Sequence, residues 1–162
     1  MSIDRHTFNI ESRHLGGKQY LSLAGVIDEN ADLAPLAEIR VPAEVNLKDV
    51  RRINSFGVRA WIDAIRKVPR EVPLVFVECP PPVIDQCNMV TGFLGHGVLK
   101  SFYAPMLCEE CDEAQNQLFE TEVCRKNGGK LPATPCPRCG RDMEVDDLEE
   151  QYLLFVREPL SQ

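Results

Sequence analysis

The chain has 162 residues, enough for one ordinary domain or for one small domain with a metal-bound module. Hydrophobic residues make up 44% of it, which supports a buried core, and the net charge of −7 disfavours binding to nucleic acid or to an anionic membrane. No apolar run approaches the roughly 20 residues that cross a bilayer, and the first residues lack the apolar core of a signal peptide. We therefore expect a cytoplasmic protein, not inserted in a membrane, whose cysteines are mainly reduced thiols.

Segments with the patterns of strands and helices alternate along the first 107 residues. In chain order, we predict strands at 7–14 and 19–28, a helix at 28–39, a strand at 43–53, a helix through 58–68, a strand at 72–80, a helix at 81–93 and a strand at 98–107. Most strand signals are apolar alternations, but 72–80 is a continuous apolar run, typical of a strand covered on both faces. This alternation predicts an α/β fold, with a mixed sheet and helices packed mainly on one side.

Two cysteine pairs stand in the polar sequence of the last third of the chain. They are Cys108-Glu-Glu-Cys111 and Cys136-Pro-Arg-Cys139, and the residues around them are too polar to bury a core. A two-residue spacer lets both thiolates of a pair bind one ion, and two pairs complete a tetrahedral four-sulfur site suited to Zn²⁺. Gly140 favours a tight turn after the second pair. We predict a structural zinc site in a small zinc-ribbon appendage, because four filled positions leave none for a substrate or a catalytic water.

Other arrangements of the cysteines stay open at this stage. Cys124 lies between the pairs and can replace one of their members, and the pairs can also be uncoordinated thiols or one redox pair. Cys79 and Cys87 lie in apolar segments and are expected in the core. Acidic residues outnumber basic ones around the pairs, so we do not expect nucleic-acid binding there.

A C-terminal helix is predicted beyond the second cysteine pair. Asp146 and Glu149 have the spacing of a capping box, and Leu148, Tyr152 and Phe155 form one apolar stripe. A helix this short is marginal alone, so we expect it to pack on the rest of the protein. The expected units are an α/β domain at 1–107, the zinc ribbon at 108–145 and the packing helix at 146–162.

The stretch Asn54-Ser55-Phe56-Gly57 lies between a predicted strand and a predicted amphipathic helix. Asn and Ser are preferred N-cap residues, so either side chain is expected to accept a hydrogen bond from an amide of the first helical turn. The positive end of the helix dipole also favours an anion, and a phosphate on Ser55 would add roughly two negative charges without necessarily unfolding the helix. These four residues are the candidate phosphosite and partner-binding surface.

The span from about Thr7 to Leu107 resembles the STAS domain of bacterial anti-sigma-factor antagonists. The similar parts are the strand YLSLAGVID, the strand–turn–helix VNLKDVRRINSFGVRAWIDAIRKV and the run VPLVFVECPPPVIDQCNMVTGF. Members of that family typically carry Asp-Ser-Ser-Gly at the turn, and a partner kinase phosphorylates the first serine. By position, Asn54 stands for the aspartate, Ser55 for the phosphorylated serine, Phe56 for the second serine and Gly57 for the glycine. The resemblance implies an STAS-like fold and, as partner, an anti-sigma-type kinase or a larger signalling scaffold.

No catalytic constellation is visible, because the histidines are scattered and neither a phosphate-binding loop nor a nucleophile elbow occurs. We expect a noncatalytic bacterial signalling protein that binds a protein partner through the surface around Ser55, with phosphorylation of that serine as a switch. The alternatives are a scaffold or assembly subunit without the switch, a module that binds a small ligand or nucleotide, and a zinc-dependent enzyme, which would need an open coordination position. The pattern indicates no particular oligomeric state.

Overall fold

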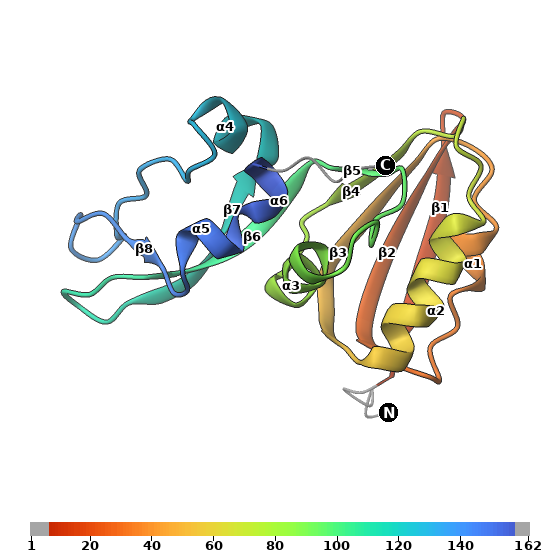
Figure 1. Ribbon diagram of the computed structural model, residues 1–162, viewed down its shortest axis with the longest axis horizontal. Helices are drawn as coiled ribbons and strands as arrows, with labels where there is room; N and C mark the ends of the chain where they lie inside the picture. The colour runs from red at the N-terminus through yellow and green to blue at the C-terminus, as the bar shows by residue number, and fades with distance from the viewer. Residues whose placement is uncertain (1–6, 158–162) are drawn as a thin grey trace.

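A five-stranded mixed sheet forms the first part of the protein, in a computed structural model that describes residues 7–157 (Figure 1). Its strands are β1 (Asn9–Leu15), β2 (Lys18–Ile27), β3 (Ala43–Ile53), β4 (Leu74–Val77) and β5 (Val98–Leu99), and they lie in that order. β1 is antiparallel to β2, and each later pair of neighbours is parallel. The predicted mixed sheet is confirmed, and each predicted strand segment contributes to it.

Three helices cover one face of this sheet. They are α1 (Ala34–Ala37), α2 (Ser55–Arg66) and α3 (Pro81–Met89), each in the connection between successive parallel strands. Right-handed crossovers that advance in one direction leave their helices on one side of a sheet. The burial of alternate residues on β3 agrees with helices on one face only, because Ala43, Val45 and Leu47 are buried. The intervening Glu44 and Asn46 are only half-buried, and Figure 1 shows α1 and α2 in front of the sheet.

The core between α2 and the sheet is built on Trp61. Its ring stacks on Phe93 with centroids 5.4 Å apart and lies 5.9 Å from the ring of Phe76 on β4. The indole Nε1–H donates to the main-chain carbonyl of Phe93 at 2.7 Å, so the polar atom of this buried ring is satisfied. This contact ties α2 to the loop before β5 and fixes the helix over the sheet.

A second, antiparallel sheet begins at Ser101. Its strands are β6 (Ser101–Leu107), β7 (Ala114–Glu120) and β8 (Glu144–Val145), in the order β7-β6-β8. The predicted strand at 98–107 is therefore divided at Lys100 between the two sheets. The division has a simple reason, since β6 finds a hairpin partner in the polar segment that follows it.

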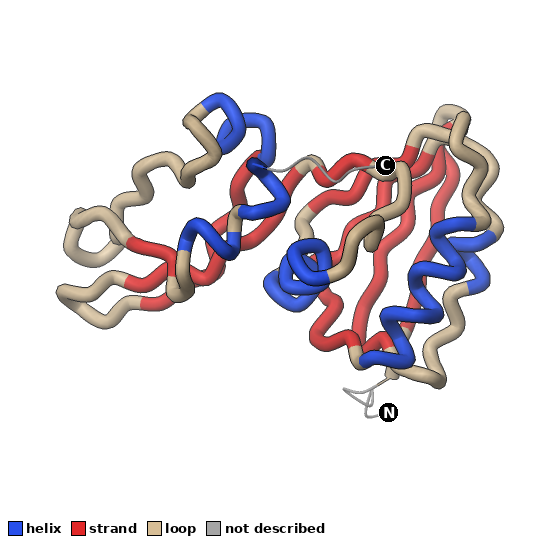
Figure 2. The backbone as a smooth tube through the Cα atoms, viewed as in Figure 1, coloured by secondary structure: helices blue, strands red, loops and turns tan. Residues whose placement is uncertain are grey.

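Short helices accompany the second sheet (Figure 2). They are α4 (Thr121–Lys126), α5 (Glu149–Tyr152) and α6 (Leu154–Arg157), so the single helix expected within 146–162 is two short turns. The expected capping box does not form, because the Glu149 carboxylate accepts the main-chain N–H of Leu131 at 3.1 Å and Leu148 takes the N-cap position without a side-chain bond. Tyr152 and Phe155 are buried but Leu148 is 64% exposed, so the expected apolar stripe is only partly correct.

The two sheets are joined at the end of β4. Cys79 N–H donates to the Ser101 carbonyl at 3.1 Å, and its own carbonyl accepts the N–H of Tyr103 at 2.8 Å. From α3, the Asn88 amide donates to the Tyr152 carbonyl at 2.9 Å and accepts the N–H of Phe155 at 3.1 Å. Hydrogen bonds therefore connect both the sheet and the helical layer of the first part to the second part.

The helix predicted at 28–39 is reduced to the single turn α1. Asp28 Oδ1 accepts the N–H of Asn30 at 2.9 Å, and Asp32 Oδ1 accepts the N–H of Ala34 at 3.1 Å. Such local bonds offer the main chain an alternative to the helical ladder.

The limits expected for the three units, at residues 107 and 145, stay predictions, and residues 1–6 and 158–162 lie outside the described part. Within residues 7–157, no helix has both the length and the apolarity that a bilayer crossing requires.

Candidate metal centre and the amino end of helix α2

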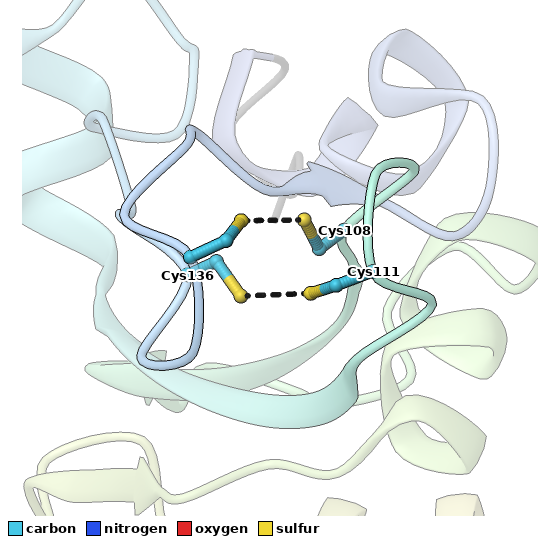
Figure 3. Close-up of side chains that lie close together, drawn as sticks. Cys108, Cys111 and Cys136 are labelled. Atoms are coloured by element: carbon cyan, nitrogen blue, oxygen red, sulfur yellow. Dashed lines mark hydrogen bonds between the residues drawn. The ribbon is translucent and has the colours of Figure 1, made fainter.

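The four cysteines of the two predicted pairs converge on one point. The sulfur atoms of Cys108, Cys111, Cys136 and Cys139 all lie within 4.8 Å of one another. Cys108 Sγ is 3.5 Å from Cys139 Sγ, and Cys111 Sγ is 3.5 Å from Cys136 Sγ, so each contact joins one pair to the other (Figure 3). This cluster can hold a metal ion, as the spacing of the cysteines predicted.

Each cysteine pair lies on a tight main-chain turn. Asp112 N–H donates to the Cys108 carbonyl, and Gly140 N–H donates to the Cys136 carbonyl, both at 2.9 Å. The residue after the second cysteine has a positive φ in both turns, +57° for Asp112 and +79° for Gly140. Glycine adopts this conformation without a steric penalty, and aspartate tolerates it. The predicted role of Gly140 is therefore confirmed.

The second sheet positions these two turns. The first turn closes the β6–β7 hairpin just beyond the pair Leu107–Ala114. The second turn lies in a smaller loop closed by the bridge between Pro135 and Asp142, and β8 follows it and pairs with β6. The fold therefore brings the two pairs together across one end of β6, although residues 112–135 separate them in sequence.

The distances between the sulfur atoms fit a tetrahedral ion. Four thiolates at about 2.3 Å from a zinc ion are separated by about 3.8 Å. The sulfur contacts of 3.5 Å and the upper limit of 4.8 Å bracket that separation. Cys108 and Cys136 are buried and Cys139 is exposed, so the centre lies at the surface of the second sheet.

The thiols differ in their readiness to ionise. Burial raises the pKa of Cys136, but hydrogen bonds from the main-chain N–H groups of Cys139 and Arg138 outweigh it and lower that pKa to about 7. For Cys111, the N–H of Glu113 favours the thiolate, but burial and the neighbouring thiols outweigh it and raise the pKa to about 12. A bound metal must displace these protons, so metal affinity falls as the pH falls.

The remaining described cysteines lie apart from this cluster. Cys79, Cys87 and Cys124 are buried free thiols, as expected for the first two. Burial raises the pKa of Cys87 to about 12 and that of Cys124 to about 11. Cys124 is therefore a core residue of the second part, and the four-sulfur set is complete without it.

The turn at the amino end of α2 is held by Asn54. Its Oδ1 accepts the N–H of Gly57 at 2.8 Å, which is the predicted N-cap bond, and its Nδ2 donates to the carboxylate of Glu29 at 3.1 Å. The Asn54 N–H also donates to the Ile27 carbonyl at 3.1 Å. The hydrogen bonds at Glu29, from its own main chain and from Asn54, lower the pKa of this carboxyl. The hydrogen bonds of Asn54 to Gly57, Glu29 and Ile27 therefore hold the turn in place.

Gly57 allows the helix to approach β2 closely. A Cβ atom at this position would lie 1.9 Å from the carbonyl oxygen of Ile27, which is a main-chain atom that cannot rotate away. The glycine is therefore needed for contact between the helix and the strand end, not for an unusual φ. Ser55 and Phe56, the two residues between cap and glycine, are exposed, and Phe56 is exposed to 66%.

One polar network was missed by the sequence analysis. Glu78, at the end of β4, has a left-handed φ of +52°, and its N–H donates to the Ser101 hydroxyl at 2.8 Å. Its carboxylate accepts the Tyr103 hydroxyl at 2.7 Å and the Asn46 amide. Burial and this carboxylate raise the pKa of Tyr103 to about 12. The one available signal was the acidic residue within the apolar run at 72–80.

Comparison of the chain with protein-family models gives no match, and comparison with curated proteins gives none either.

Proposed function

We propose that this chain is a noncatalytic bacterial signalling protein that binds a partner protein through the turn Asn54–Gly57 of an STAS-like domain. The observation that carries the proposal is the adjacent exposure of Ser55 and Phe56 on a turn that the hydrogen bonds of Asn54 hold in place. Because Asn54 and Gly57 hold the turn, a partner can bind it with little loss of main-chain entropy.

Phe56 supports the choice of this surface. It is a large aromatic side chain with 66% of its surface exposed, next to a residue that is not needed for the cap. Aromatic residues of this kind often carry much of the energy of protein–protein contacts. Exposure of one apolar residue is common in itself, but Phe56 is distinguished by its position beside Ser55 at the amino end of α2.

Ser55 supports a switch at the same place. It is the first residue of α2, and the cap bond is made by Asn54, so a phosphate on the serine would not remove that bond. The helix end favours the added charge, but Glu29 lies within reach of the same turn through its bond to Asn54. Phosphorylation would therefore place the negative charges of the phosphate and of Glu29 close to Phe56. A partner that binds the uncharged turn would then be released.

The four cysteines support a structural zinc site in a zinc-ribbon appendage. Four thiolates are the donor set that zinc prefers in closed sites, and a four-sulfur shell has no position for a substrate. Zinc would stabilise a sheet whose β7 strand has only Phe119 buried. This role leaves partner binding as the function of the protein, with an anti-sigma-type kinase or a signalling scaffold as the expected partner.

The test compares four baits in a pull-down from the native lysate, read by mass spectrometry. Wild type and Thr91→Asp, which adds a charge at an exposed residue after α3, should capture the same partner. Ser55→Asp and Phe56→Ala should lose it. Equal capture by Ser55→Asp and wild type contradicts the switch, and equal capture by all four baits contradicts the surface and favours a scaffold that binds elsewhere.

A further inference from the structure

Strand β1 presents a long free edge. It pairs with β2 from Asn9 to Leu15 without a register shift, and no other described strand pairs with it. All its residues are exposed except Ile10, which is half-buried. Proteins usually protect such edges with proline, lysine, a bulge or a short strand, because unpaired N–H and C=O groups bind other strands. β1 has no proline, lysine or bulge and is seven residues long, and its two charged residues, Glu11 and Arg13, have opposite signs.

The turn that follows β1 determines which main-chain groups face outward. Gly16 and Gly17, with φ of +60° and +77°, form a two-residue turn between Leu15 and Lys18. In such a hairpin the residues flanking the turn form a hydrogen-bonded pair, and hydrogen-bonded and non-hydrogen-bonded pairs then alternate. Ser12 therefore lies in a non-hydrogen-bonded pair with β2, so its N–H and C=O point away from the sheet. The same holds two residues on either side, at Ile10 and His14.

We propose that a second copy of this chain occupies this edge, pairing antiparallel with β1 about a twofold axis at Ser12. In this register the outward-facing residues pair with one another, Ser12 with the partner's Ser12 and Ile10 with the partner's His14. Each hydrogen-bonded pair exchanges two bonds, so the three such pairs would form about six main-chain bonds. The two five-stranded sheets then become continuous.

Charge complementarity selects this register. It places Glu11 opposite the partner's Arg13, and Arg13 opposite the partner's Glu11. Both are non-hydrogen-bonded pairs, in which the Cα atoms are only about 4.5 Å apart and the side chains are closest. Opposite charges stabilise such a cross-strand pair, and like charges destabilise it. The Ser12 hydroxyl already accepts a bond from Gln19 at 2.9 Å within its own sheet, so it leaves the outward main chain free.

The other sheet edges suit self-pairing less well. β5 and β8 have two residues each, too short for a stable ladder. β7 is as long as β1, but a twofold axis at its central Gln117 places no opposite charges together, because its only charged residue is Glu120. The described edges therefore single out β1.

The test is sedimentation equilibrium of the full chain over a concentration series, with circular dichroism to confirm folding. Wild type should dimerise. Glu11→Arg and Arg13→Glu each place like charges at both positions and should weaken the dimer by about fourfold to several hundredfold, since cross-strand pairs contribute roughly 0.2–1 kcal/mol each and both pairs change sign here. The double variant Glu11→Arg/Arg13→Glu should dimerise like wild type.

An equimolar mixture of the two single variants gives the sharpest result. One chain carries two arginines and the other two glutamates, so only the heterodimer satisfies both pairs, and the mixture should dimerise when neither component does. A monomeric wild type overturns the proposal. So do single variants that dimerise as tightly as wild type, which is the result expected for pairing through β7. None of these substitutions touches the Ser55 turn, so their outcome is independent of the proposed function.

Discussion

The guanidinium of Arg141 lies 2.7 Å from the carboxylate of Glu110, and this ion pair joins the two cysteine turns. A second contact between the turns, Arg138 with Glu113 at 3.9 Å, is looser. Both pairs are exposed, and exposed ion pairs contribute about 0–1 kcal/mol. Zinc binding to zinc-finger peptides is worth about 10–16 kcal/mol, so a bound metal, rather than the ion pairs, should hold the turns together.

We expect Cys136→Ser to lose bound metal, because the remaining three thiolates no longer form a closed shell. Arg141→Ala should keep the metal and change the free energy of unfolding by no more than about 1 kcal/mol. Elemental analysis of the purified proteins gives the metal content and its identity, and urea unfolding gives the stability. Metal retained at the wild-type level by Cys136→Ser would show that the cluster is not the binding site.

Removal of the metal should separate the cysteines into two classes of reactivity. After treatment with a chelator, iodoacetamide should modify the cluster thiols, Cys136 first because its pKa is lowered to about 7, while Cys79 and Cys87 stay unmodified because they are buried in the core. Cys124 reports on the fold of the second part, since it is fully buried there. Peptide mass spectrometry reads each site, and modification of Cys124 only after chelation would show that the second part needs metal to fold. Rapid modification of Cys79 in the untreated protein would contradict the structure.

The N-cap of α2 should depend on Asn54 and not on Ser55. Asn54→Ala removes the acceptor for the Gly57 N–H and should lower the free energy of unfolding by about 1 kcal/mol. Ser55→Ala, the neighbouring control, should stay within about 0.5 kcal/mol of wild type. Asn54→Asp keeps the acceptor but places a second carboxylate beside Glu29. Its free energy of unfolding should therefore lie between those of Asn54→Ala and Ser55→Ala. Equal losses for the two alanine variants in urea titrations would mean that the serine shares the cap.

Tyr103 should make the protein less stable at alkaline pH. Its pKa is raised to about 12, first by burial and then by the bond to Glu78, so the folded state favours the neutral phenol. This contribution is fully present below the pKa of an unfolded tyrosine, about 10, and is lost as the pH rises toward 12. Tyr103→Phe should therefore lose less stability than wild type between pH 9 and about 11. Parallel pH profiles of the two proteins, measured by urea unfolding, would rule out this role.

Local patterns were sufficient for the metal centre and for the amino end of α2. Each cysteine pair lies on one short turn whose hydrogen bonds stay within that turn, so its geometry follows from the spacing of the two cysteines. The cap is equally local, since the Asn54 side chain bonds an amide three residues on. The convergence of the two pairs was predicted from chemistry, because only together do they fill a four-sulfur shell.

Strand β7 and the division at Lys100 depend on longer-range contacts. AQNQLFE has little of the β-branched or apolar character that marks a strand, and it becomes one because the first cysteine turn fixes it opposite β6. Once β6 and β7 are paired, β6 belongs to a separate sheet. The apolar run at 98–107 does not show that it is divided between two sheets. The prediction of a helix at 28–39 was largely wrong for the opposite reason. Here local contacts decide, since aspartate side chains accept hydrogen bonds from nearby main-chain N–H groups and prevent a longer helix.

The Asn88 amide has a wider consequence for the whole molecule. Its nitrogen donates to the carbonyl of Tyr152, and its oxygen accepts the N–H of Phe155, three residues further on. One side chain therefore binds a main-chain acceptor and a main-chain donor, as a neighbouring strand does in a sheet. Rotation between the two parts would break both bonds at once. The junction where a linker would ordinarily act as a hinge is therefore held by side-chain hydrogen bonds as well as by the chain itself, and α5 and α6, which follow β8, both contact α3.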